Sequence, residues 1–517
     1  MISNNTHVKD TQKYYLSLAV LTAAVSGLAA QILSYHYNYN FAYRDSIFRM
    51  EAARRFFDSN TPGIINQMGT VWLPVPNLIL MPFAYIDFLW RTGLAASIVN
   101  FPLFVLSAVI IFLSIKELTK SPAASWFGFL IYVFNYNILY FQTTAMTEQF
   151  YITFLICSFY FLLLWLREND IKYLVLSSLV LCLNTGTRYD AWPVVIVSIF
   201  FVFLISLSKK DKPLVNTLIY GLPPVFLVVL WFVYNLIQYR DPLEFSRGQF
   251  STLHQLEYYE ASGRLLTKNN LLLSAKVYFN SVLLYSGKIY AILASAGLII
   301  YTFKNRLSAK SLPVYILCIA LPVTLLLLYK GQLIIELPDS VPPGYFNSRY
   351  GLYLFPAISV FSAITVSWLI GNHFKKIFLI IFFFVLLAQQ LIFFEDFPAK
   401  IPSIAEAEYS YSKPSEDLSM YLKNNYKGGK ILYDNLIFAL SPSTGINLTD
   451  RITFHTFKLA GPAMANPSKY VNWVLIYKDA PNDQIYSAVK NNPDFLNNFE
   501  LKFSENGVEA YSNKHPL

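Results

Sequence analysis

Six charged side chains near the ends of apolar runs are the residues of this sequence whose types suit chemistry. Three are acidic and three are basic: Asp45, Glu148, Arg188, Asp190, Lys288 and Arg349. A carboxylate can take a proton from an attacking hydroxyl group, and a guanidinium group binds phosphate through paired hydrogen bonds. Ionisable residues are costly next to lipid, so these six are candidates for a functional site.

The composition indicates that membrane-spanning helices position these residues. Hydrophobic residues fill 55% of the 517 positions and charged residues 14%, whereas soluble domains carry about 25% charged residues. Apolar runs of about 20 residues, the length that a helix needs to cross the hydrocarbon, recur without the alternation of barrel strands. The sequence therefore predicts an α-helical polytopic membrane protein and excludes an ordinary soluble enzyme.

We predict about eleven spans in a cell or inner membrane. They lie near residues 15–34, 92–115, 122–141, 149–166, 173–187, 191–208, 214–236, 277–302, 312–329, 351–370 and 377–395. The short loops after even-numbered spans are basic, which places them and residues 1–14 in the cytoplasm by the positive-inside rule. The odd number of spans then places the C-terminal region outside the cytoplasm.

The candidate residues fall on one side of this predicted membrane domain. Asp45 follows the first span, Glu148 opens the fourth, and Arg188 lies in the outer turn between the fifth and sixth. Arg349 precedes the tenth span, and Lys288 lies in the outer half of the eighth. A secondary transporter favours charges at mid-membrane and two matching halves, and neither is evident. The pattern favours chemistry on a lipid headgroup.

The chain divides into a transmembrane domain at 15–399 and a small α/β domain at 400–517. The transmembrane domain carries three outer loops, at 35–91, 237–276 and 330–350. In the C-terminal domain, strand-like runs near 430–433, 471–477, 500–503 and 508–511 alternate with helical stretches near 414–425 and 482–491. Asn506-Gly507 predicts a hairpin turn between the last two strands.

The first outer loop contains two helix-like stretches. Residues 44–57 carry three apolar residues at helical spacing, typical of a helix that lies on the membrane surface: Phe48, Ala52 and Phe56. Asp45 and Arg49 are four residues apart, so a simple ion pair is the alternative to a functional role. Residues 71–90 are apolar but contain three prolines, which favours an interfacial or re-entrant helix over a clean span.

Five motifs follow one another in order along the chain. "RDSIFRMEAARRFFDSNTPG" comes after the first span, "GTVWLPVPNLILMPF" before the second and "TTAMTEQFY" at the fourth, and "TRYDAW" and "NSRYGLYLFP" follow. This order resembles the GT-C superfamily of membrane glycosyltransferases. Within it, the chain is most similar to the branch of protein O-mannosyltransferases, aminoarabinose transferases and Rgt-type galacturonosyltransferases. The resemblance covers roughly residues 15–400.

The resemblance implies transfer of a sugar, with inversion, from a polyprenyl-phosphate donor to an acceptor on the outer face of the membrane. Asp45 would be the general base, and Glu148 would orient the acceptor or share a metal. Arg188 and Arg349 are the first choices for stabilising the leaving phosphate, because a guanidinium group is a planar bidentate donor.

Six further side chains complete the predicted substrate site. Lys288 and Arg49 are second choices for the phosphate, and Asp190 either binds substrate or pairs with Arg188 in a surface turn. Trp72, Tyr189 and Tyr350 either stack on sugar or lipid or anchor helix ends at the interface.

The sequence departs from the family pattern at two places. The Asp-Glu pair that follows the first span in the family is Asp45-Ser46 here, and the Lys-Pro-Pro of aminoarabinose transferases is replaced by Leu73-Pro74-Val75-Pro76. Six scattered His residues suggest no zinc site. We therefore predict no metal ligands and no certain cofactor, and leave a divalent metal open.

Two other classes of protein fit the same topology. One is a glycolipid transporter or flippase, and the other is a non-catalytic, glycan-binding scaffold of the same fold. For the enzyme, the predicted partners are a polyprenyl-phosphate sugar, an acceptor that is a glycan, lipid or protein, and membrane lipid. Nucleic acid is not predicted, because the basic residues that give the net charge of +9 are spread among loops.

Overall fold

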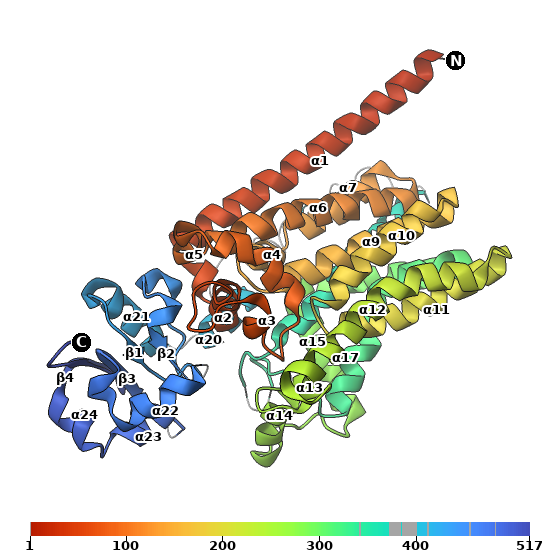
Figure 1. Ribbon diagram of the computed structural model, residues 1–517. Coiled ribbons are helices and arrows are strands. Elements are labelled where there is room, and N and C mark those ends of the chain that lie inside the picture. Colours follow the sequence, from red (N-terminus) through yellow and green to blue (C-terminus); the bar gives the residue numbers. More distant parts are fainter. Residues whose placement is uncertain are drawn as a thin grey trace. The chain divides into compact units, whose positions relative to one another are not determined.

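The computed structural model is mostly helical and separates into two units by its internal contacts (Figure 1). It describes residues 2–340, 343–371, 384, 401–410, 413–453, 456–480 and 482–517. The first unit comprises Met1–Ser34, Thr70–Pro76 and Asn100–Glu406, and the second comprises Tyr35–Gly69, Asn77–Val99 and Ala407–Leu517. The predicted boundary at residue 400 follows the sequence alone, whereas the contacts group the first outer loop with the C-terminal residues.

The first unit is built from long apolar helices. Its α-helices are α1 (Ile2–His36), α6 (Leu94–Thr119), α7 (Pro122–Val133), α8 (Tyr136–Phe141), α9 (Glu148–Glu168), α10 (Ile171–Thr185), α11 (Ala191–Lys209), α12 (Pro213–Tyr239), α13 (Glu244–Arg247), α14 (Thr252–Ala261), α15 (Leu271–Ser286), α16 (Lys288–Asn305), α17 (Ala320–Tyr329), α18 (Phe355–Gly371) and, up to Glu406, α20 (Pro402–Ser410). Two 3-10 helices matter below, η2 (Ala309–Cys318) and η3 (Ser348–Leu354).

Ten of the eleven predicted spans coincide with these helices. Within the described residues, six helices are long and apolar enough to cross a membrane, and eight are if each of two bent pairs forms one span. The chain is an integral membrane protein, as predicted. The eleventh predicted span, at 377–395, lies outside the described residues except for Phe384.

The predicted eighth span is not one straight helix. α15 and α16 meet at an angle of 110°, and η2 and α17 of the predicted ninth span meet at 47°. Gly287 separates α15 from α16 with φ of +82°, a backbone conformation that glycine adopts without the strain of a Cβ atom. Lys288, predicted within this span, is the exposed first residue of α16, directly after the bend.

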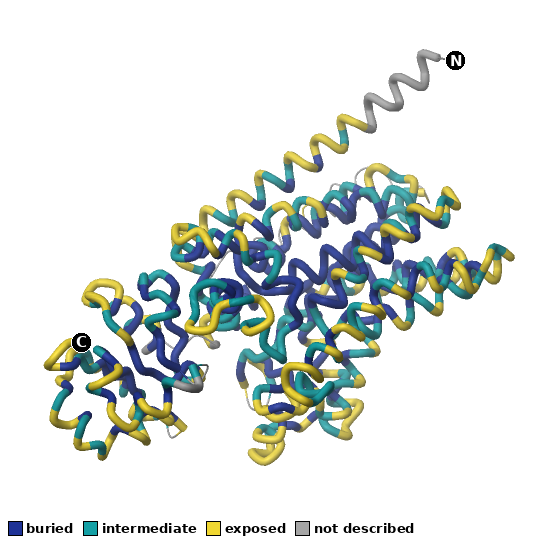
Figure 2. The backbone as a smooth tube through the Cα atoms, in the orientation of Figure 1, coloured by how far each residue is buried: buried dark blue, intermediate teal, exposed yellow. Residues whose placement is uncertain are grey.

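Burial distinguishes the helices of this unit (Figure 2). In the most apolar window of α9, 83% of the residues are buried, whereas in that of α1 17% are buried. The exposed apolar surface of α1 suits contact with lipid. The high burial of α9 makes it a central element of this unit, and Glu148 is its first residue.

Segment 71–90 is not a span. α4 (Pro74–Ala84) has 11 residues, a length of about 16 Å at 1.5 Å per residue, against a hydrocarbon core of about 30 Å. It is followed by α5 (Asp87–Thr92). The short helices fit the predicted interfacial or re-entrant segment better than a clean span.

Close packing of α16 on α18 depends on Gly297. A Cβ atom at this position would overlap the backbone carbonyl of Phe361 and approach the Thr365 hydroxyl to 2.8 Å. Small residues allow membrane helices to approach in this way, so the backbones have no room for a methyl group.

Gly297→Ala is therefore expected to destabilise the protein by about 1–3 kcal/mol, the usual cost of overpacking. Thermal unfolding of the purified protein in detergent measures this effect. Gly371→Ala is the matched control, because no atom of the described residues lies within 4 Å of a Cβ atom there. Equal midpoints for the two variants would contradict the expectation.

The second unit contains a mixed sheet in the C-terminal residues, where the sequence predicted a small α/β domain. The strands are β1 (Ile431–Leu432), β2 (Arg451–Ile452), β3 (Trp473–Tyr477), β4 (Phe499–Glu505) and β5 (Val508–Asn513), in the order β2-β1-β3-β5-β4. β1 is parallel to β2 and β3, and β5 is antiparallel to β3 and β4. Asn506 and Gly507 both have positive φ, which confirms the predicted hairpin turn.

The helices of this unit come from the first outer loop and from the C-terminal residues. They are α2 (Arg44–Arg54), α3 (Ile64–Gln67), most of α4, α5, the end of α20, α21 (Lys413–Asn425), α22 (Phe457–Ala465), α23 (Gln484–Val489) and α24 (Pro493–Asn498). The sequence predicted α21 and α23 but not α22, α24 or the two-residue strand β2.

The first outer loop and the C-terminal residues are joined by buried polar contacts within this unit. Arg451 donates from Nη1 to Glu51 Oε1 at 2.5 Å. The carboxylate of Asp58 accepts the backbone N–H groups of Leu448 and Thr449 at 3.1 and 3.0 Å. Loop and sheet are therefore one structural body.

The apolar stripe of α2 is covered by protein rather than by lipid. Ala52 and Phe56 are buried, and Phe48 packs against a cluster that includes Ile47 and Ala439. This differs from the predicted surface helix, because the C-terminal residues supply an apolar surface that the loop sequence alone does not reveal.

Candidate active site

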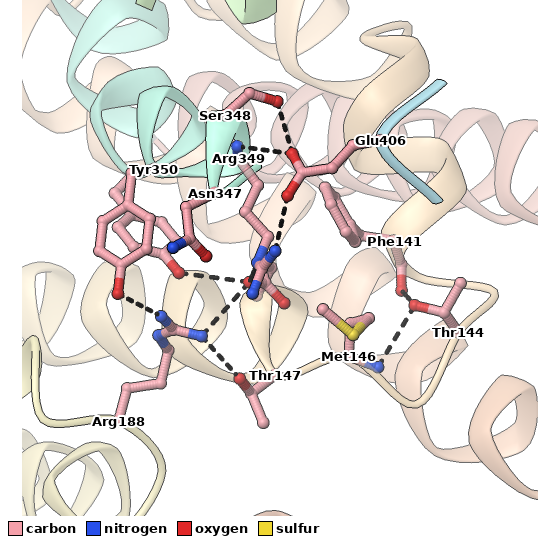
Figure 3. A network of polar contacts seen from close by, with 12 residues as sticks. Phe141, Thr144, Met146, Thr147, Arg188, Asn347, Ser348, Arg349, Tyr350 and Glu406 are labelled. Atoms are coloured by element: carbon pink, nitrogen blue, oxygen red, sulfur yellow. Dashed lines mark hydrogen bonds and ion pairs between the residues drawn. The ribbon is translucent and has the colours of Figure 1, made fainter. Parts of the chain in front are cut away.

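Five charged side chains of the first unit meet in one hydrogen-bonded network. Figure 3 labels three of them, Arg188, Arg349 and Glu406. The five come from four places in the sequence, and we call them the ion cluster: Glu148, Arg188, Asp190, Arg349 and Glu406. Glu148 opens α9, Arg188 and Asp190 lie between α10 and α11, Arg349 lies in η3 and Glu406 in α20. Four of the five were predicted as site residues, and Glu406 was not.

Glu148 is the centre of the ion cluster. It is fully buried, and its Oε1 atom accepts from Arg188 Nη1 at 3.3 Å, from Arg349 Nε at 3.1 Å and from the Tyr353 hydroxyl at 3.2 Å. Its place in the first turn of α9 also suits a negative charge, because the helix dipole is positive there. A buried carboxylate requires such partners, and here it holds two guanidinium groups together.

Arg188 is fixed from several sides. Its Nε donates to Asp190 Oδ2 at 2.8 Å and its Nη1 to the Thr147 hydroxyl at 3.0 Å. Its Nη2 lies 3.4 Å from the Tyr350 hydroxyl, near the limit of a hydrogen bond. The guanidinium carbon also lies 4.9 Å from the ring centre of Tyr353, a favourable cation–π distance.

Arg349 is held between two carboxylates. Its Nε donates to Glu148, and its Nη1 donates to Glu406 Oε1 at 2.6 Å. The backbone N–H of Arg349 donates to Glu406 Oε2 at 3.1 Å. Asn347 precedes this turn with φ of +53°, a left-handed conformation that Asn tolerates, and the chain turns there into η3.

Tyr189, which follows Arg188 in the sequence, makes hydrogen bonds and ring contacts of its own. The Tyr189 hydroxyl donates to the Val71 carbonyl at 2.8 Å and accepts from Trp231 Nε1 at 3.2 Å. Its ring stacks on Phe245 with centres 5.3 Å apart. Tyr189 therefore belongs to an aromatic group with Trp231 and Phe245. Trp72 is half-buried in the short segment 70–76.

Comparisons with known proteins identify the fold of this chain. Residues 74–235 match the family model of dolichyl-phosphate-mannose-protein mannosyltransferase. Two structures of ArnT from Cupriavidus metallidurans, one in the apo state and one bound to undecaprenyl phosphate, resemble the chain with TM-scores of 0.53 and 0.54. Each match covers 98% of both chains, at 12% and 10% identity. The chain has the GT-C fold.

The predicted GT-C fold is thereby confirmed. The archaeal oligosaccharyltransferase AglB from Archaeoglobus fulgidus, in complex with an inhibitory peptide and a dolichol-phosphate, is also similar. That match has a TM-score of 0.50 and 12% identity, and it covers 98% of this chain and 75% of AglB. No curated protein sequence matches the chain.

Two predicted site residues belong to the second unit. Asp45 lies in the first turn of α2, where the helix dipole favours a negative charge. Arg49 follows one turn later and is buried. The ion cluster and Asp45 are therefore carried by different units.

The ion cluster contains more carboxylates than guanidinium groups. Glu148, Asp190 and Glu406 face Arg188 and Arg349, so three formal negative charges oppose two positive ones. Within the described residues, no group of three or more His, Cys, Asp or Glu side chains is arranged to hold a metal ion. The basic groups that this cluster offers to a ligand are its two guanidinium groups.

The sequence contained only a weak signal for Glu406. It stands in the run "SIAEAEYS" with a second glutamate, Glu408, two residues later. Glu406 is 1% exposed, whereas Glu408 is exposed. Only the path of α20 distinguishes the two, and that path depends on tertiary structure.

Proposed function

We propose that this GT-C protein transfers a sugar from a polyprenyl-phosphate donor to an acceptor on the outer face of the membrane. The observation that carries the proposal is the meeting of two guanidinium groups, Arg188 and Arg349, on buried Glu148. Their side chains are 12% and 11% exposed, so both are largely shielded from water but keep a small surface that a ligand can contact. ArnT was captured with undecaprenyl phosphate and AglB with a dolichol-phosphate, which supports this class of donor.

The proposed reaction is a single displacement with inversion. The acceptor hydroxyl oxygen attacks the anomeric carbon, and the bond from that carbon to the phosphate oxygen breaks. The phosphate leaves with the bonding electron pair, and the hydroxyl proton passes to the Asp45 carboxylate. A carboxylate suits this role because its oxygens only accept hydrogen bonds when ionised.

Arg188 and Arg349 stabilise the charge that develops on the leaving phosphate. Hydrogen-bond donors that are already oriented cost no reorganisation when the charge appears. Glu148, Asp190 and Tyr350 orient Arg188 in this proposal. This role for Glu148 replaces the contact with an acceptor or a shared metal that the resemblance implied.

Arg188→Met is expected to weaken binding of undecaprenyl phosphate by about 10- to 100-fold. A hydrogen bond to a charged group contributes about 1.5–3 kcal/mol, and 1.4 kcal/mol is a factor of ten. Binding is measured on the protein in lipid nanodiscs, with undecaprenol, which lacks the phosphate, as the uncharged ligand.

Arg247→Met is the matched control. This arginine also pairs with an aspartate, Asp241, but its side chain is 61% exposed, so its removal should leave binding unchanged. Equal affinity of the wild-type protein for undecaprenyl phosphate and undecaprenol would overturn the proposed phosphate site.

A further inference from the structure

Glu406 is a buried carboxylate of the ion cluster to which the reaction proposed above assigns no step. We propose that Glu406 is a positioning residue that holds Arg349 in place and lowers its affinity for phosphate, so that the polyprenyl phosphate product is released. The inference rests on the proposed function. It adds a residue that neither the family motifs nor the loop pattern indicated.

The contacts of Glu406 fit a positioning role. Its Oε2 atom accepts from the Ser348 hydroxyl at 2.5 Å, from the Arg349 backbone N–H at 3.1 Å and from the Tyr285 hydroxyl at 3.2 Å. Its Oε1 atom accepts from Arg349 Nη1 at 2.6 Å. One oxygen thus anchors the carboxylate to the protein, and the other holds the guanidinium group.

The same contacts make Glu406 a competitor of the phosphate. A guanidinium group that is bonded to a carboxylate at Nη1 presents fewer donors and less net charge to an incoming anion. The ion cluster already has three carboxylates for two arginines. An anion that binds Arg349 therefore displaces or shares the interaction with Glu406, which weakens its binding.

Glu406→Gln replaces one of the two side-chain oxygens by an NH2 group and keeps the other, so it tests their two roles separately. The three donors around Oε2 retain the amide oxygen at that position, so the amide NH2 group faces Arg349 Nη1. Two donors then face each other, and the ion pair is lost while the size of the side chain is kept. Arg349 loses a competing anion without being removed.

The test measures the affinity of undecaprenyl phosphate for the full chain in nanodiscs. Glu406→Gln is expected to bind it about tenfold more tightly than the wild-type protein and to release it more slowly. In a protein that already carries Arg349→Met, Glu406→Gln should leave the affinity for undecaprenyl phosphate unchanged, because Glu406 acts through Arg349. Ser348→Ala, which removes one bond to Glu406 but no charge, should not tighten binding.

The outcomes distinguish this inference from the proposed function. If the wild-type protein prefers undecaprenyl phosphate to undecaprenol but Glu406→Gln binds it equally or more weakly, this inference is wrong and the phosphate site stands. If the wild-type protein shows no such preference, the proposed function fails first. Where Glu406→Gln does not fold, Glu406→Asp retains the charge one methylene further from Arg349. Glu406→Asp is expected to bind undecaprenyl phosphate more tightly than the wild-type protein, but by less than tenfold. An affinity no higher than that of the wild type would overturn the inference.

Discussion

Replacing Asp45 by asparagine is expected to lower sugar transfer by about 10²- to 10⁴-fold, the range that a general base contributes. Asparagine has nearly the same shape as aspartate but cannot take up the proton of the acceptor hydroxyl. Asp45 is only half-buried in the first turn of α2, so the fold should survive. Incorporation of labelled sugar from the lipid-linked pool of isolated membranes measures the effect.

Asp87→Asn is the matched control for this experiment. Asp87 lies in the same unit, its side chain is 58% exposed, and it pairs with Arg54 rather than with a proposed substrate group. Transfer by this variant should stay close to that of the wild type. Full transfer by Asp45→Asn would rule out Asp45 as the base.

The second large effect is expected from Arg349→Met, which should destabilise the protein by about 3–5 kcal/mol. Removing one member of a buried ion pair leaves the other as an uncompensated charge. Here two carboxylates, Glu148 and Glu406, lose a partner, and they are 0% and 1% exposed. The unfolding midpoint of the purified protein is the measurement.

Two further variants test that explanation. Arg247→Met removes a surface pair, for which the expected cost is at most about 1 kcal/mol. Adding Glu406→Gln to Arg349→Met should restore part of the lost stability, since one buried charge disappears, but should not restore transfer. A double variant no more stable than Arg349→Met would show that buried charge is not the cause.

The spans could be predicted from the sequence because each depends on a local property. Twenty apolar residues form a helix in lipid whatever their neighbours are, and ten predicted spans appear as helices or helix pairs. The 110° bend at Gly287 was not predicted, because a glycine between apolar runs is also compatible with a straight span.

The candidate site could be predicted only in part. Glu148, Arg188 and Arg349 were identified because charges next to apolar runs are rare and therefore stand out. Their shared hydrogen bonds could not be predicted, because those depend on how α9, η3 and the turn before α11 pack. Glu406 stands in a polar region, where one more carboxylate carries no signal.

The contacts between the first outer loop and the C-terminal residues have a consequence for protein engineering. A chimera that exchanged only the residues after 406 with those of a relative would separate Arg451 from Glu51, and Leu448 and Thr449 from Asp58. The helix that carries Asp45 would then lose its support, whatever the new domain recognised. A graft that preserves this helix moves three segments together: 35–69, 77–99 and 407–517.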